Sequence, residues 1–275
     1  MKTYLTLSAI ALAAAATLSS GTVLAQAAAP AVKPDFAVTG TFGITSDYRF
    51  RGLQQTDGEP AFQGGFDVAH SSGLYVGTWG SNVSSWAAGP NSSVKLETNL
   101  YGGYKTEVSG VGVDVGAIAY IYPGSSSGSI NKTDYRANTQ EAYVGLSYGI
   151  ATFKTSYVLS NNYFASSGSK NAGTMYYDLT LAKEIMPKLT ASIHAGYLDY
   201  KKDAESAVGG KLSYADYNVG LAYDLGNAFT LGAKYFWNDA KPGTKSYANA
   251  ASADYGNGRP NLYKDGFAVS LTKAF

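Results

Sequence analysis

The sequence contains no cysteine and only eight prolines in 275 residues. A small secreted domain held together by disulfide bonds is therefore excluded, and the chain must gain its stability in another way. Beyond residue 25 no run of about 18 consecutive apolar residues occurs, which excludes a membrane-spanning helix. A closed β-sheet in a membrane is one arrangement that satisfies both conditions.

An excess of charge of either sign is also absent. The chain has 21 lysines and arginines against 20 aspartates and glutamates. Without a basic excess, nothing indicates a nucleic-acid partner, and we expect none.

The first 25 residues resemble a secretory signal peptide. Lys2 precedes an apolar, alanine-rich run from Leu5 to Leu18, and Val23-Leu24-Ala25 fits a signal-peptidase site. The alternative to a signal peptide is a buried helix. A membrane-spanning helix is excluded because it would need a longer apolar run. We therefore predict a signal peptide over residues 1–25 and a loose N-terminal lead-in over 26–35.

Tyrosine and glycine are abundant, with 23 and 32 residues, and apolar residues alternate with small or polar ones. Near the C-terminus, Phe267, Val269, Leu271 and Phe275 share one face of a strand, and glycine, alanine, serine and threonine occupy most of the other. The same alternation recurs along the chain. It predicts twelve strands, near residues 36–50, 60–70, 73–83, 93–106, 111–122, 138–148, 151–161, 173–184, 188–200, 216–225, 229–238 and 262–275.

The connections between these strands alternate between short and long. Short links near 71–72, 107–110, 149–150, 185–187 and 226–227 alternate with long ones near 51–59, 84–92, 123–137, 162–172, 201–215 and 239–261. Transmembrane barrels have this asymmetry, with short periplasmic turns and long extracellular loops. A soluble β-sandwich is the alternative, but it would not need tyrosines at the strand ends, where we place Tyr104, Tyr148, Tyr157, Tyr197, Tyr217 and Tyr235. The predicted fold is all-β, a transmembrane antiparallel up-and-down barrel over residues 36–275.

A family resemblance is carried by the stretch "SDYRFRGLQQTDGEPAFQGGFDVAHSSGLYVGTWGSNV" at 46–83. Shorter blocks add to it: "ETNLYGGY" (97–104), "YIYPG" (120–124), "EAYVGLSY" (141–148), "YYDL" (176–179) and "DYNVGLAYD" (216–224). Together they resemble the TorF family of porin-like proteobacterial outer-membrane proteins. The resemblance implies an outer-membrane β-barrel acting as a pore, without a settled substrate or agreed catalytic residues.

The final residues "FAVSLTKAF" are similar to the C-terminal signal by which barrels are recognised for assembly, although Lys273 stands where an apolar residue is usual. We therefore expect the barrel-assembly machinery to act through the strand ending in Phe275. The other expected partners are outer-membrane lipid, lipopolysaccharide and small hydrophilic solutes, and no cofactor is expected. The oligomeric state is left open.

Charged residues in the stretch "SDYRFRG" lie two residues apart, as the faces of a strand require. With Phe42, Ile44, Tyr48 and Phe50 facing lipid, Asp47, Arg49 and Arg51 face the interior, where a charge costs little. The same parity extends the pore-lining candidates along the chain. They are Asp47, Arg49, Arg51, Asp67, Lys95, Glu97, Glu141, Lys154, Asp178 and Lys234.

Two interpretations of these charges remain open. Arg49 and Arg51, facing acids such as Asp67 or Glu97, could form a constriction with a transverse field, or the charges could pair and only stiffen the interior. Twelve strands give a backbone radius of about 12 Å and an opening of roughly 10 Å or less. Inward glycines such as Gly103 and Gly116 would leave room in it, although glycine also relieves packing in any tightly coiled sheet. We predict a channel for passive diffusion of small hydrophilic solutes; the alternative is a non-conducting structural or adhesion barrel whose loops bind a partner.

An enzymatic function has little support in the sequence. Only two histidines are present, His70 at a short turn and His194 on an inward face, and no HExxH or phosphate-loop motif occurs. The stretch GSSSG at 124–128 matches GxSxG, but it lies within a predicted long loop and not at the strand-to-helix turn that a nucleophilic serine needs. A hydrolase acting on lipid would need its base outside, with an oriented partner. We therefore predict that the protein is not an enzyme, with a barrel hydrolase as a distant third possibility.

Overall fold

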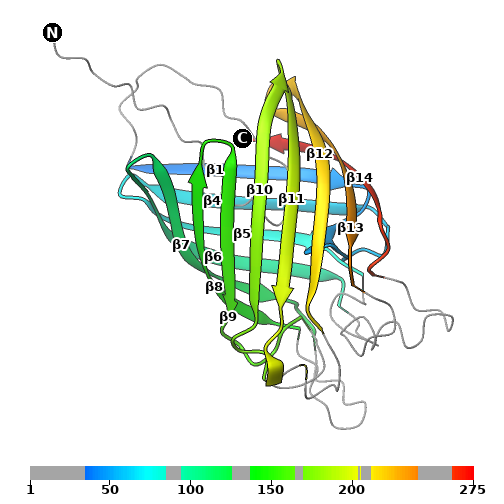
Figure 1. Cartoon of the computed structure of the whole chain (residues 1–275). Coiled ribbons are helices and arrows are strands. Elements are labelled where there is room, and N and C mark those ends of the chain that lie inside the picture. The colour runs from blue at the N-terminus through cyan, green and yellow to red at the C-terminus, as the bar shows by residue number, and fades with distance from the viewer. Residues whose placement is uncertain are drawn as a thin grey trace.

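The computed structural model describes residues 35–84, 94–125, 137–164, 170–203, 205, 212–240 and 262–275. Within these ranges, twelve antiparallel strands close into a barrel, and β14 pairs with β1 to complete it (Figure 1). The predicted twelve-stranded all-β fold is therefore confirmed. The predicted signal peptide lies outside the described residues, as does nearly all of the lead-in.

The barrel strands follow the chain order, and each pairs with its neighbour in sequence. Two further strands, β2 (Arg49–Phe50) and β3 (Leu53–Gln54), form a separate small sheet. The wall consists of β1 (Phe36–Thr45), β4 (Ala61–His70), β5 (Leu74–Asn82), β6 (Leu96–Val108), β7 (Val111–Ile121), β8 (Thr139–Tyr148), β9 (Ala151–Val158), β10 (Met175–Met186), β11 (Leu189–Asp199), β12 (Tyr214–Gly226), β13 (Phe229–Asn238) and β14 (Gly266–Ala274).

The two ends of the barrel differ in their connections. One end, here called the turn end, carries the five short turns and the C-terminal Phe275 and lies at the upper left of the barrel in Figure 1. The turn between β6 and β7 consists of Ser109 and Gly110, with φ of 52° and 81°. Positive φ at both central residues is typical of the tight turns that match strand twist. The opposite end, called the loop end, receives the long connections, large parts of which lie outside the described residues.

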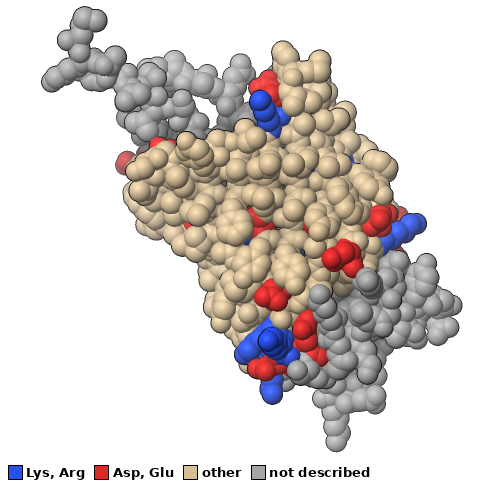
Figure 2. Space-filling model, in the orientation of Figure 1, with Lys and Arg blue, Asp and Glu red and all other residues tan. Residues whose placement is uncertain are grey.

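The outer face of the wall is apolar. Large side chains such as Phe42, Phe66 and Leu100 are more than half exposed on it, and Figure 2 shows a broad uncharged surface with most charged residues toward its ends. The six tyrosines predicted near strand ends all lie on this outer face. In β5 the outer residues are Leu74 and Val76, while Tyr75 and Trp79 point inward. Among the described residues, no helix is long and apolar enough to cross a membrane.

The first strand is shorter than predicted. β1 ends at Thr45, and Tyr48 and Phe50, which we expected to face lipid, lie inside the barrel. The ring of Tyr48 packs 5.5 Å from that of Trp79, and the ring of Phe50 lies 5.5 Å from that of Tyr120. The prediction was wrong because polar and aromatic residues alternate in this stretch in the same way whether the chain continues along the wall or bends into the bore. The alternation therefore does not show which side faces lipid.

Inward glycines do not leave open space along one side of the wall. Tyr75 is the cross-strand partner of Gly103, and Tyr101 is the partner of Gly77, so each tyrosine ring lies over a residue without a side chain. Tyr143 covers Gly116 in the same way. The expectation that inward glycines leave room in the bore is therefore wrong at Gly103 and Gly116, because the tyrosine rings fill the space.

Replacing Gly103 by alanine is expected to lower the free energy of unfolding by about 1–3 kcal/mol. A Cβ atom there would overlap the carbonyl oxygen of Val115 and lie 2.9 Å from Gly116 Cα. Gly145→Ala is the matched control, because its Cβ would meet no atom closer than 3.6 Å. Urea unfolding in detergent micelles measures both variants, and equal stability of the two would contradict the packing argument.

Candidate functional site

The chain leaves the wall at the loop end of β1 and folds into the bore. Residues 46–56, here called the inner hairpin, contain β2 and β3 joined by Arg51 and Gly52, with φ of 49° and 77°. A Cβ atom on Gly52 would lie only 2.6 Å from Asp216 Cβ of β12. Glycine is therefore required there both for the turn and for the close approach to the opposite wall.

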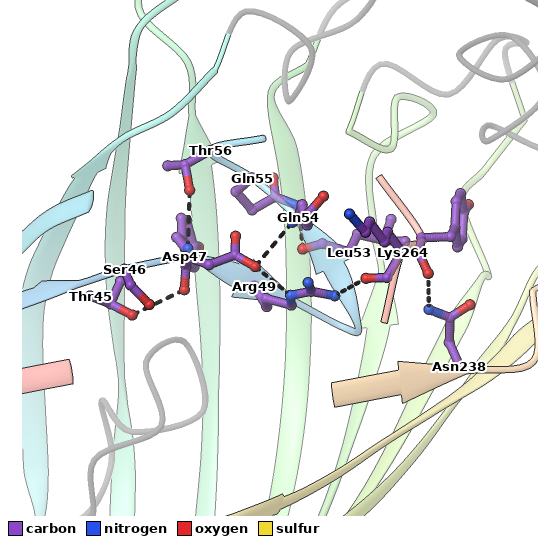
Figure 3. Close-up of polar contacts among 12 residues, drawn as sticks. Thr45, Ser46, Asp47, Arg49, Leu53, Gln54, Gln55, Thr56, Asn238 and Lys264 are labelled. Atoms are coloured by element: carbon purple, nitrogen blue, oxygen red, sulfur yellow. Dashed lines mark hydrogen bonds and ion pairs between the residues drawn. The ribbon is translucent and has the colours of Figure 1, made fainter. Parts of the chain in front are cut away.

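Asp47 and Arg49 hold the base of the inner hairpin (Figure 3). The Asp47 carboxylate accepts hydrogen bonds from Arg49 Nε at 2.7 Å and from Gln54 Nε2 at 3.1 Å. Arg49 Nη1 donates to the carbonyl oxygen of Lys264 at 2.5 Å. Both charged side chains are almost fully buried, so their hydrogen bonds stabilise the hairpin from within.

Arg51 carries the tip of the hairpin across the bore. Its guanidinium forms a bidentate ion pair with the Glu141 carboxylate of β8, with N–O distances of 2.8 and 2.7 Å. It also donates a hydrogen bond to the Tyr163 hydroxyl at 2.6 Å. β1 and β8 are separated by four strands in one direction and six in the other. The Arg51–Glu141 pair therefore joins opposite walls.

The Arg51–Glu141 pair is withdrawn from solvent, with side-chain exposures of 6% and 0%. Burial lowers the pKa of Arg51, but the Glu141 carboxylate outweighs this effect and holds that pKa well above its ordinary value. The guanidinium also lies over the Tyr176 ring, 4.3 Å from its centroid. The charge on Arg51 is thus fully compensated within the bore.

The inner hairpin is fastened to the wall on several sides. The Tyr214 hydroxyl donates to the Arg51 carbonyl oxygen at 2.9 Å, and the Tyr48 hydroxyl lies 3.3 Å from the Glu97 carboxylate. Gln54 N donates to the Leu262 carbonyl oxygen at 2.9 Å. Since Tyr48, Glu97 and Glu141 are each at most 2% exposed, the hairpin and its contacts occupy the loop-end half of the bore.

A second group of polar residues lies nearer the middle of the strands. Asp178 of β10 is the cross-strand partner of Lys154 of β9, whose ammonium lies 4.0 Å from the centroid of the Tyr143 ring. His194 of β11 lies between two carboxylates, 3.4 Å from Asp178 and 3.1 Å from Asp216. Acidic and basic groups therefore alternate around this part of the interior.

The sector formed by β4 to β8 combines acids with tyrosines. The Tyr101 hydroxyl donates to Asp67 at 2.8 Å, and the Tyr75 hydroxyl donates to Asp114 at 2.6 Å. Tyr75 and Tyr143 share a further hydrogen bond of 2.5 Å between their hydroxyls. Each of these acids is thus held by a wall tyrosine, which sequence parity did not reveal, because the register between strands was unknown.

The structure brings some of the predicted pore-lining residues together and separates others. Arg51 and Glu141 form an ion pair, as do Asp47 and Arg49, whereas the predicted acidic partners Asp67 and Glu97 contact tyrosines instead. Lys154 and Asp178 are cross-strand neighbours, and Lys234 is inward on β13. Lys95 lies just before β6 and is exposed. Tyr163 was missed, although the abundance of tyrosine was a signal. His194 and Asp216 have the inward parity expected from the sequence, but neither was counted among the pore-lining candidates.

The part of the interior that the structure describes offers polar groups but no assembled metal site. Within the described ranges, no group of three or more histidine, aspartate or glutamate side chains could hold a metal ion.

A closed sheet with an apolar exterior and a charged, hydrogen-bonded interior defines a transmembrane β-barrel. The chain belongs to the Gcw_chp family, described as bacterial proteins of unknown function, whose model matches residues 27–275. The narrower TorF name stays a prediction.

Comparison with solved structures finds porins. The KdgM porin aligns with 7% identity and a TM-score of 0.49, over 86% of this chain and 99% of that chain. The NanC porin aligns with 12% identity and the same TM-score, over 86% and 98%. Pseudomonas aeruginosa OprD aligns with 11% identity and a TM-score of 0.39, over 88% and 66%. A comparison with curated proteins found no significant match.

Proposed function

We propose that this chain is a porin-like channel of the bacterial outer membrane, through which small hydrophilic solutes diffuse passively. The turn end faces the periplasm and the loop end faces outward, as in transmembrane barrels generally. The observation that carries the proposal is the polar interior between β9 and β13, where Lys154, Asp178, His194 and Lys234 lie inside a wall whose exterior is apolar. Such groups are stabilised by water in a bore.

In this proposal the inner hairpin is the constriction. It crosses from β1 to β8 and is locked by Arg51 and Glu141. Because both side chains are buried, a solute passes this level of the bore only when the hairpin shifts. The channel is therefore narrow, and its opening depends on the Arg51–Glu141 contact.

A non-conducting structural barrel is the second candidate. The observation that favours it is the burial of Tyr48, Glu97 and Glu141, which leaves almost no accessible surface at that level of the bore. Under this alternative, the hairpin is a permanent plug, and the loops or the outer face carry the function.

Planar-bilayer recording separates the two candidates. We expect purified wild-type protein to give small unit steps, and Glu141→Ala to give larger steps, because Arg51 loses its anchor and the inner hairpin is released. Lys201→Ala is the matched control, since Lys201 pairs with Asp203 at 3.4 Å near the loop end but both side chains are exposed. The control should conduct like the wild type.

Each outcome of the recording has a distinct meaning. Silence of both the wild type and Glu141→Ala over many insertions would refute the channel and favour the structural barrel. Unit steps of equal size in the two proteins would support a channel but would show that the inner hairpin is not its constriction. Heat-modifiable migration on a gel verifies that each variant is folded.

A further inference from the structure

A groove crosses the outer face of the barrel on the side where β14 closes onto β1. Its volume is about 640 Å³, within the range of roughly 300–1,000 Å³ typical of small-molecule sites. It follows one row of cross-strand neighbours over six strands: Phe229, Lys273, Phe42, Gly64, Gly80 and Thr98. All six residues line it.

The groove exists because small residues interrupt an otherwise bulky outer face. Gly64 and Gly80 are direct cross-strand partners, and Thr98 follows as the next neighbour in the row. Along one edge, the Phe275 ring lies over Gly40 and against Phe66, so two phenyl rings form a wall beside the glycines. The result is an apolar depression bordered by aromatic rings.

A single cation stands in the row that forms the groove. Lys273 is outward on β14, at the turn end, where its ammonium donates to the Asn227 carbonyl oxygen and lies 4.5 Å from the Phe229 ring centroid. An ammonium has three N–H donors, and the hydrogen bond to Asn227 uses one of them. Its position beside the turn between β12 and β13 places it at the level of lipid headgroups.

The groove rises from this cation into the apolar band. Between Lys273 and Thr98 the row crosses five strands. With neighbouring strands about 4.8 Å apart and tilted about 40°, it rises by roughly 12 Å over this distance. This rise is about half of the apolar band of roughly 25 Å. A headgroup at Lys273 and a hydrocarbon chain along Gly64 and Gly80 would therefore each meet a matching surface.

We propose that the groove binds one anionic glycerophospholipid of the leaflet at the turn end, with its phosphate at Lys273 and an acyl chain over Gly64 and Gly80. The charge of Lys273 favours this occupant, because an anionic phosphate complements an outward ammonium at headgroup level. The site does not depend on whether the bore conducts. A second copy of the chain on the same groove is the competing occupant.

Native mass spectrometry of the full-length mature protein in detergent, titrated with phosphatidylglycerol, tests the site. We expect one tightly bound lipid on the wild type, and Lys273→Gln should weaken its binding about tenfold through loss of a charge-assisted hydrogen bond. Lys183→Gln is the matched control, because Lys183 is also an outward lysine near the turn end, on β10, away from the groove. It should bind like the wild type.

A second pair of variants tests the apolar part of the groove. Thr98→Phe fills the groove at a position that already has a Cβ atom, and we expect it to abolish the bound lipid. Ala195→Phe adds the same ring to the outer face of β11, outside the groove, and should leave binding unchanged.

The proposal is overturned if Lys273→Gln and Thr98→Phe bind phosphatidylglycerol as well as their controls do. It is also overturned if neutral phosphatidylcholine binds with equal affinity. A wild-type dimer that Thr98→Phe converts to a monomer would assign the groove to a second copy instead.

Discussion

Replacing Glu141 by leucine is expected to lower the free energy of unfolding of the barrel by about 3–5 kcal/mol, as removal of one partner of a buried ion pair does. The remaining Arg51 charge would be left in a nearly dry part of the bore, since its side chain is only 6% exposed. Arg51→Met should have an effect of the same size, because Glu141 would then be the uncompensated charge. Urea unfolding in detergent micelles or liposomes measures both.

The double variant distinguishes an ion pair from two independent contributions. Arg51→Met with Glu141→Leu is expected to destabilise the barrel by much less than the sum of the single variants, because neither charge is left alone. Lys201→Ala breaks the exposed pair with Asp203 and should change stability by less than about 1 kcal/mol. Full additivity of the two single effects would show that Arg51 and Glu141 do not act as a pair.

An arginine in place of Val144 is expected to destabilise the barrel in a phospholipid bilayer by about 2–4 kcal/mol. Val144 is outward and lies near the middle of β8, where hydrocarbon would surround the new charge. Tyr148→Arg is the matched control on the same strand and face. Tyr148 lies at the turn end, where the same substitution should cost only about 0–1 kcal/mol.

This depth dependence tests the placement of the barrel in a membrane. Reversible unfolding in liposomes gives both free energies under one condition. A small, equal effect of the two arginines would mean that water, rather than hydrocarbon, surrounds the middle of β8. The membrane placement, and the lipid site with it, would then have to be abandoned.

The strands of the wall could be predicted because their determinants are local. Alternation with period two depends only on which face a residue occupies, and short turns such as Ser109-Gly110 join strands that are adjacent in the sequence. The number of strands, the apolar outer face and the inward side of most charges therefore follow from the chain itself. The facing of β5 was harder to predict, because Tyr75 and Trp79 are large residues that point inward.

The candidate site could be predicted only in part. Parity identified Arg51 and Glu141 as inward residues, but it carried no information on which inward residues meet. Their sequence separation is 90 residues, and the contact forms only because the barrel closes and the inner hairpin crosses it. The tyrosines over Gly77 and Gly103 were missed for a related reason, since pairing across strands depends on register.

The amino-acid pattern alone therefore specifies a β-sheet with one apolar face and one polar face, because apolar and polar residues alternate along each strand. Closure of that sheet decides the rest. Only when β14 meets β1 do Lys273, Gly64 and Gly80 fall into one row, and only then does the bore acquire an opposite wall for Arg51 to reach. Contacts between distant segments depend on the geometry of the closed barrel, which no short stretch of sequence contains.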